Sequence, residues 1–404
     1  MKILDIQIFQ GEERKMAVIA CSISTIISTL AINKSDTTLS NSSDFLRTVL
    51  LIINYLVTLV CIYELLNKRK RPNIAIIIAV LFSWGLSTLH TASGVSTSLS
   101  FLAVIQLLLF AFFTTNEYVS LFKIWSVYLV IMALFGIIAY VSFTLNLAIP
   151  YSIDQYYGDN ESIYYVNYGF SNIYLNDSML RLCGLFNEPG VFGTCCALIL
   201  CADKFNLRKI GNIILLIAAI FSFSLAAMLI ALIYLAFISI KNRHSMSATV
   251  VLVGAFLLLA SINSSNDSFE QLLSRVDLKN KTFKDDRTND VFEKELEKQR
   301  ESTVDFLFGY GEGINKGKGV VVSSFKSNIL EHGLIGSVLL YSLIFIPAFR
   351  KAKGNYFAVM FVFLLIIQQY NTNSPYTLSS FTNILCGVSY VKYQNLVKRW
   401  RKLQ

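Results

Sequence analysis

Long apolar runs separated by short basic clusters constrain the fold of this chain more than any other feature of its sequence. Only 15% of the 404 residues are charged, whereas a soluble domain carries about 25%. A helix needs about 20 apolar residues to cross a bilayer. Candidate spans occupy residues 16–33, 46–66, 73–90, 98–115, 123–148, 184–203, 210–222, 224–240, 248–262, 327–347, 355–371 and 377–392. The sequence predicts an all-α polytopic membrane protein, one integral membrane domain over residues 1–404 with about twelve transmembrane helices.

The positions of Lys and Arg predict how the chain is threaded. Residues 210–240 are long for one span and short for two. Cytoplasmic loops carry an excess of basic residues, and a single span there would place the clusters before and after it on opposite faces. With two spans and a cytoplasmic N-terminus, the inner segments include "KRKR" (68–71), "KFNLRK" (204–209), "KNRH" (241–244), "RKAK" (350–353) and "KRWRK" (398–402). We therefore expect twelve spans with both termini in the cytoplasm.

Two segments on the predicted outer side are too long to be simple connections. The first, 149–183, is rich in Tyr and Asn, which suits a surface that stacks on sugars. An ordinary solvated loop with interfacial tyrosines has the same composition, so both interpretations stay open. The second, 263–326, is charged, and the spacing of Glu293, Glu297 and Arg300 predicts an exposed helix. The net charge of +9 follows from the basic clusters beside the spans and does not indicate nucleic acid.

Arg181 and Glu188 lie in "RLCGLFNEPGVFG" (181–193), at the mouth of a predicted span. An ionisable residue at the edge of hydrocarbon is a candidate functional residue, because an unpaired charge is costly there. Pro189 suits the first turn of a helix, so a structural cap is the alternative role for Glu188. The alternative role for Arg181 is structural, because its side chain could snorkel to the membrane interface.

Three further residues are candidates. Arg275 and Arg287 belong to the second outer loop and could surround a phosphate or diphosphate together with Arg181, because the planar guanidinium matches phosphate oxygens. A charged, solvated loop is the alternative. His332, at the outer end of the span 327–347, is either a proton carrier or a helix-packing residue beside Gly333 and Gly336.

The sequence predicts no metal and no cofactor. It has no HExxH or CxxC motif and no Asp pair with metal-ligand spacing. The seven cysteines lie in or beside apolar runs, as small buried hydrophobes do. "GYGEGINKGKG" (309–319) is rich in glycine but lacks the GK[ST] of a phosphate-binding loop, so it is expected to be a flexible turn.

Two of these motifs resemble a known family. "R-L-C-G-L-F-N-E-P" resembles the Arg-x-x-Gly-x-x-x-Glu-Pro signature of bacterial O-antigen polymerases (Wzy) and related capsule polymerases. "LFGYGEG" followed by "SSFKSNILEHGLIG" resembles the end of the large periplasmic loop and the next span in that group and in the O-antigen ligases (WaaL). Arg287 corresponds to the family's loop arginine upstream of that turn. Ligases typically carry a His-Asn pair where this chain has Val322 and Ser323, which favours a polymerase.

The resemblance implies a C-type glycosyltransferase-like enzyme of the bacterial inner membrane, active in lipopolysaccharide or other surface polysaccharide biosynthesis. Such an enzyme joins undecaprenyl-diphosphate-linked oligosaccharide repeat units at the periplasmic face. Arg181, Arg275 and Arg287 would bind the diphosphate without a metal, and Glu188 or His332 would be the base. The lipid-linked oligosaccharide, membrane lipids and a chain-length regulator are the partners to consider. The alternatives are an O-antigen ligase that transfers glycan to lipid A core, or a flippase or other transporter, which should have pseudo-symmetric halves.

Overall fold

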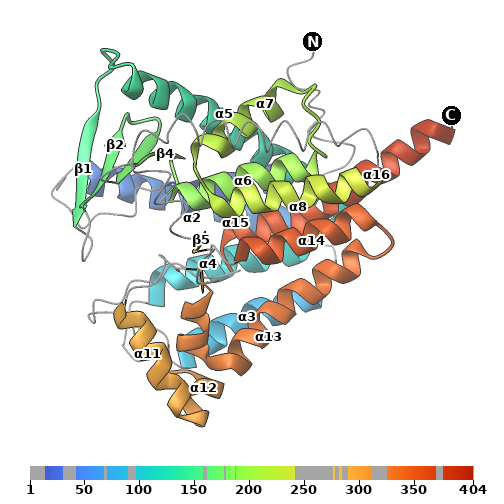
Figure 1. The fold of residues 1–404 in the computed structure, drawn as a ribbon. Helices are drawn as coiled ribbons and strands as arrows, with labels where there is room; N and C mark the ends of the chain where they lie inside the picture. Colours follow the sequence, from blue (N-terminus) through green and yellow to red (C-terminus); the bar gives the residue numbers. More distant parts are fainter. Residues whose placement is uncertain are drawn as a thin grey trace.

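The computed structural model describes residues 14–30, 42–67, 71–89, 97–157, 162–176, 179–186, 188–241, 276–277, 282–283, 290–311, 325–369 and 376–403. In this part of the chain a helical bundle carries a small β-sheet at one end (Figure 1). The C-terminal helix ends at the opposite end of the bundle. We call these the sheet end and the C-terminal end.

The helices form where the apolar runs predict them. Only the predicted span 248–262 lies outside the described residues. The helices are α1 (Lys15–Thr29), α2 (Ser42–Asn67), α3 (Ile74–Leu89), α4 (Thr97–Leu109), α5 (Thr115–Thr144), α6 (Pro189–Ala202), α7 (Ile210–Phe221), α8 (Leu225–Lys241), α13 (Lys326–Ala352), α14 (Tyr356–Gln369) and α15 (Leu378–Phe381), which continues through the π-helix η5 (Thr382–Gly387) into α16 (Val388–Leu403). Within the described residues, three stretches are long and apolar enough to cross a membrane: Thr48–Asn67, Thr115–Thr144 and Lys326–Ala352.

The run 210–240 is two helices and not one. Residues 222–224 separate α7 from α8, and Phe223 has a positive φ of 46°. At 1.5 Å per residue the 12 residues of α7 rise about 18 Å, which is short of the roughly 30 Å of a hydrocarbon core. Phe221, the last residue of α7, packs against Tyr140 of α5, one turn before the end of that 30-residue helix.

The first predicted outer loop is not irregular, and here the all-α prediction is wrong. Its strands β1 (Ser152–Tyr157), β2 (Ser162–Asn167), β3 (Asn172–Asn176) and β4 (Met179–Gly184) form an antiparallel sheet in the order β1-β2-β3-β4. Val166, Ile173 and Leu182 are fully buried on it. Gly136 of α5 admits Leu182, because a Cβ there would lie 2.8 Å from a Leu182 methyl carbon. These three side chains are direct cross-strand partners on one face of the sheet, and their burial holds that face on α5.

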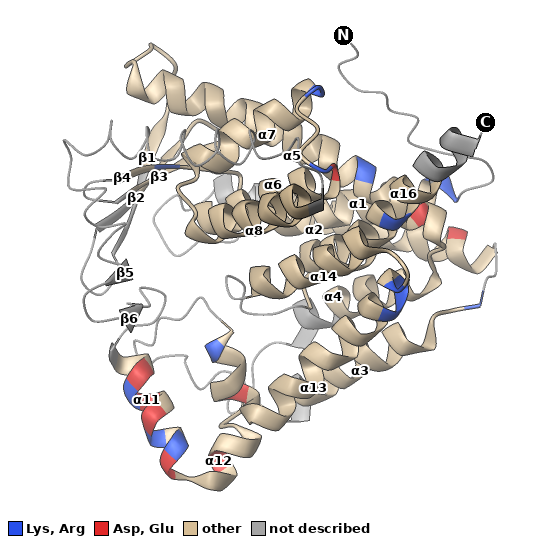
Figure 2. Cartoon of the chain, turned by 45° about the vertical axis from the view of Figure 1, so that its right-hand side comes forward, with Lys and Arg blue, Asp and Glu red and all other residues tan. Residues whose placement is uncertain are grey.

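The second predicted outer loop contains the expected charged helix, α11 (Asp290–Glu301), followed by α12 (Thr303–Phe308). Two short strands, β5 (Val276–Asp277) and β6 (Thr282–Phe283), pair before it. Phe292 and Leu296 bury one face of α11 against Leu330 of α13. The other face carries acidic and basic side chains, as Figure 2 shows. Figure 2 also shows a largely uncharged bundle interior, with Lys and Arg gathered near the C-terminal end.

Candidate functional site

Arg181 is fixed at the sheet end by groups from two other elements. It lies on β4 opposite Tyr174 of β3, and its guanidinium carbon is 5.8 Å from the centre of the Tyr174 ring. Its Nε donates to the carbonyl of Ser222 at 3.1 Å, and one Nη donates to that of Phe223 at 3.3 Å. These carbonyls follow the C-terminus of α7, where helix carbonyls carry partial negative charge. The guanidinium is therefore preorganised, and it is only partly buried.

Close packing explains Gly184 and Gly193 of "RLCGLFNEPGVFG". Gly184 ends β4 with a φ of +63°, and a Cβ there would lie 3.3 Å from the Phe192 ring. A Cβ on Gly193 of α6 would overlap Ser222 in the turn after α7. Ser224 of the same turn donates to the carbonyl of Gly190 at 3.3 Å. The segment thus holds β4, the start of α6 and the α7–α8 turn together.

Glu188 is the N-cap residue of α6, and Pro189 occupies the first helical position as predicted. The Glu188 side chain makes no capping hydrogen bond to α6, so a structural cap role, which is the alternative for this residue, would rest on the helix dipole alone. The positive end of the α6 dipole still favours a carboxylate at this position. Glu188 is partly exposed.

His332 lies beside a sharp break in α13. Gly333 has φ 68° and ψ −179°, which is not helical. Asn328 donates to the hydroxyl of Tyr341 at 3.0 Å, although 13 residues of straight helix would separate them by about 20 Å. Residues 326–332 therefore fold back beside the rest of α13. His332 is 7% exposed, and a Cβ on Gly336 would lie 2.9 Å from the His332 Cβ, which suits the packing role, one of the two roles predicted for this histidine.

The loop "GYG" (309–311), expected to be a flexible turn, is hydrogen-bonded to this break. Tyr310 N donates to the carbonyl of Leu330 at 2.9 Å, and Gly311 N donates to that of Glu331 at 2.8 Å. The break at Gly333 leaves these carbonyls without their helical partners, and the loop supplies replacements. Gln299 of α11 adds a donor to the Leu330 carbonyl at 3.1 Å. We call residues 309–311 together with 330–333 the glycine joint.

The structure brings some of the predicted site residues together and separates another. Arg181 and Glu188 lie at the junction of β4 with the N-terminus of α6. His332 lies on α13, whose principal neighbours are α3 and α12, in a different part of the sheet end (Figure 1). Arg275 and Arg287 lie outside the described residues, so the three-arginine pocket stays a prediction.

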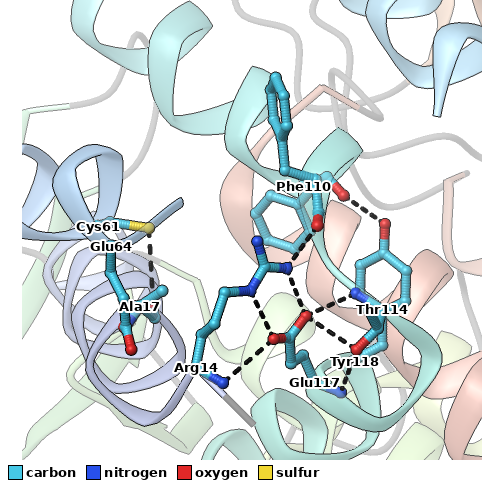
Figure 3. A network of polar contacts seen from close by, with 9 residues as sticks. Arg14, Ala17, Cys61, Glu64, Phe110, Thr114, Glu117 and Tyr118 are labelled. Atoms are coloured by element: carbon cyan, nitrogen blue, oxygen red, sulfur yellow. Dashed lines mark hydrogen bonds and ion pairs between the residues drawn. The ribbon is translucent and has the colours of Figure 1, made fainter. Parts of the chain in front are cut away.

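A buried ion pair that no sequence motif indicates lies at the C-terminal end (Figure 3). Arg14, just before α1, is 1% exposed, and Glu117, in the first turn of α5, is fully buried. The guanidinium donates to both carboxylate oxygens, at 2.7 and 2.6 Å. Glu117 also accepts the backbone N–H of Thr114 at 2.7 Å, and Glu64 of α2 accepts the N–H of Ala17. The carboxylates of Glu117 and Glu64 thus cap the N-terminus of α1. This capping role is visible only in the folded structure, where α5 and α2 contact α1.

A second polar cluster that the sequence did not predict lies inside the bundle, around the π-helix η5. Asn383 accepts the indole N–H of Trp125 at 3.1 Å and donates to the Cys195 sulfur at 3.7 Å. The three residues come from η5, α5 and α6, and each is at most 2% exposed. π-helical turns are rare and often mark functional sites. The residues "TNILCG" do not indicate such a turn in the sequence, so only the structure identifies it.

We expect Asn383→Ala to destabilise the protein by about 1–3 kcal/mol, because it leaves the buried Trp125 N–H without an acceptor. Thermal unfolding of the purified protein in detergent would measure this. Ser379→Ala, at the start of the same helix, is the control and should change the unfolding temperature little. Equal unfolding temperatures for Asn383→Ala and wild type would contradict the hydrogen bond.

The comparisons with known proteins identify no relative: no family model, no curated protein and no solved structure matches the chain. Among the residues that the structure describes, no three His, Cys, Asp or Glu side chains gather where they could hold a metal ion.

Proposed function

We propose that this chain is a polysaccharide polymerase of the bacterial inner membrane, with about twelve spans and cytoplasmic termini. It would join undecaprenyl-diphosphate-linked repeat units of O-antigen or a related surface polysaccharide. The observation that carries the proposal is the preorganised guanidinium of Arg181, beside the N-terminus of α6, within the Arg-x-x-Gly-x-x-x-Glu-Pro motif. The resemblance of this motif to the polymerase signature supplies the substrate class.

The geometry of Arg181 suits a leaving diphosphate. An acceptor sugar hydroxyl attacks the anomeric carbon of the donor sugar, the bond from that carbon to the phosphate oxygen breaks, and the diphosphate leaves with the electron pair. Negative charge therefore grows on the diphosphate in the transition state, where a fixed cation stabilises it most. Two backbone carbonyls and a tyrosine ring already orient Arg181, so little reorganisation is needed.

Glu188 is the residue that we propose to receive the proton of the acceptor hydroxyl. It lies at the start of α6, seven positions after Arg181, and its side chain is not used to cap that helix. His332, before the break in α13, packs beside Gly336 of the same helix, in another part of the sheet end. This position makes it the weaker candidate for the base. Arg275 and Arg287 would complete the diphosphate site from the second outer segment.

Substitution of Arg181 tests the proposal. In purified protein supplied with its lipid-linked repeat unit, and without added metal or nucleotide, we expect Arg181→Ala to lower the rate of chain extension on the order of a hundredfold. Arg181→Lys should be intermediate, because lysine keeps the charge and loses the planar fork. In cells, Arg181→Ala should leave lipid core bearing a single unit, whereas a ligase defect leaves bare core.

Arg208→Ala is the matched control, since Arg208 is exposed near the C-terminal end of α6. It should give normal chain-length ladders. Because Arg181 also holds the α7–α8 turn, unfolding temperatures must accompany the assay. A folded Arg181→Ala variant with a normal ladder would remove the proposal.

A further inference from the structure

The exposed side of α5 carries a continuous stripe of apolar side chains. Helix α5 is one of the stretches long and apolar enough to cross a membrane, and its 30 residues rise about 45 Å, the thickness of a bilayer with its headgroup regions. Apolar side chains recur on it every three or four residues and are exposed: Ile131, Leu134, Phe135, Ile138 and Val141. In a helix that crosses a membrane, such a stripe faces lipid.

The turn between β2 and β3 lies against this stripe. Phe170, in the turn, has its ring centroid 5.6 Å from that of Phe135. Phe135 precedes Thr144, the last residue of α5, by nine residues, or about 14 Å along the helix. The headgroup region is only about 5–7 Å thick on each side of the hydrocarbon core. The turn therefore reaches back along the lipid-facing side of α5, to the outer end of the acyl chains.

The backbone of the turn is satisfied locally. Tyr168 N donates to the carbonyl of Ser171 at 3.0 Å, and Gly169 N donates to Oδ1 of Asn167 at 2.6 Å. Backbone N–H groups must be paired within the protein wherever lipid replaces water. No atom lies within 4 Å of the Cβ position of Gly169, so the tip of the turn is open to its surroundings.

Aromatic and apolar side chains continue from the turn to the start of β1. The rings of Tyr168 and Tyr151 have centroids 5.5 Å apart, and those of Tyr151 and Phe143 are 5.8 Å apart. Between the end of α5 and β1 the large apolar side chains stay exposed, namely Leu145, Leu147, Tyr151 and Ile153. An exposed apolar surface of this extent marks an interaction site, and tyrosines are enriched where a membrane meets water.

We propose that the β2–β3 turn inserts into the bilayer leaflet at the sheet end, where Phe170 and Tyr151 contact phospholipid acyl chains just below the headgroups. Phospholipid is the occupant because the apolar surface is continuous with the lipid-facing stripe of α5. Insertion of an apolar edge into the boundary between headgroups and acyl chains is how amphipathic elements bind membranes. Because β4 pairs with β3, the insertion also sets the depth of Arg181. The contact does not depend on the polymerase proposal.

Spin labels test this insertion in the full-length protein. Phe170→Cys, Ile138→Cys and Glu297→Cys are each labelled and reconstituted into phosphatidylcholine liposomes. All seven native cysteines are buried, and labelled wild type measures their background. Collisions of the label with oxygen, which concentrates among acyl chains, are compared with collisions with a water-soluble nickel chelate. The ratio should favour oxygen at Phe170, as at the lipid-facing reference Ile138, and nickel at Glu297 on the exposed face of α11.

Tyr151→Cys keeps the test decisive if Phe170→Cys fails to fold, because Tyr151 is 50% exposed and its label should also favour oxygen. A ratio that favours nickel at Phe170, or at Tyr151 where Phe170→Cys does not fold, would overturn the proposal. Spectral broadening at the same position that disappears on dilution with unlabelled protein would overturn it too. That result would place a second copy of the chain, and not lipid, against the turn.

Discussion

Gly333→Ala is expected to destabilise the protein by about 3–5 kcal/mol, and Gly309→Ala by a similar amount. Both glycines have a positive φ with ψ close to 180°, a conformation that is essentially restricted to glycine. A Cβ on Gly333 would overlap the backbone of Leu307, and a Cβ on Gly309 would overlap that of Glu331. Backbone atoms cannot rotate away as a side chain can, so the strain has to open the glycine joint.

Hydrogen exchange would detect this opening where it occurs. The amides of Tyr310 and Gly311 donate to the carbonyls of Leu330 and Glu331, so they should be protected in the wild type and exchange quickly in either variant. Gly354→Ala is the matched control. Gly354 also has a positive φ, of 81°, but nothing lies within 4 Å of its Cβ position, so only about 1 kcal/mol of backbone strain is expected. If all three variants lost equal stability, the close approach of Gly309 to Gly333 would be excluded as the cause.

The second large effect is expected at the buried ion pair. Arg14→Met should destabilise the protein by about 3–5 kcal/mol, because it leaves the fully buried Glu117 carboxylate without its counter-charge. Glu117→Gln should cost a similar amount, since it strands the guanidinium. The Arg14→Met/Glu117→Gln double variant should be more stable than the sum of the single losses predicts, because it removes both buried charges. Unfolding temperatures and denaturant midpoints in detergent would measure the coupling.

The pair Lys326–Glu293 is the control for this cycle. Its nitrogen–oxygen separation of 2.7 Å is similar to the 2.6 Å of the buried pair, but its side chains are 23% and 41% exposed, so water screens the charges. Lys326→Met should therefore cost no more than about 1 kcal/mol. Strictly additive losses at Arg14 and Glu117 would contradict their burial as a pair.

The role of Arg181 depends on its contacts with a segment that is distant in the sequence. The sequence indicates that an arginine at the edge of an apolar run needs an explanation, and offers a phosphate ligand or snorkelling. The structure adds a third role, because the carbonyls of Ser222 and Phe223, some 40 residues further along, receive its hydrogen bonds. These bonds are compatible with a diphosphate site and preorganise the guanidinium for it. They also mean that stability and activity have to be measured together in any Arg181 variant.

Local sequence was enough to predict the positions of the apolar helices within the described residues, including the division of 210–240 into α7 and α8. Apolar content and helical length are local properties that can be read from one stretch of chain. The sheet of residues 152–184, the break at Gly333 and the Arg14–Glu117 pair required the tertiary structure. Val166, Ile173 and Leu182 became a buried face only when α5 covered them, and Glu117 found its partner 103 residues away. A buried polar group or a strained glycine is stabilised by atoms from elsewhere in the chain, and only the folded structure specifies which atoms those are.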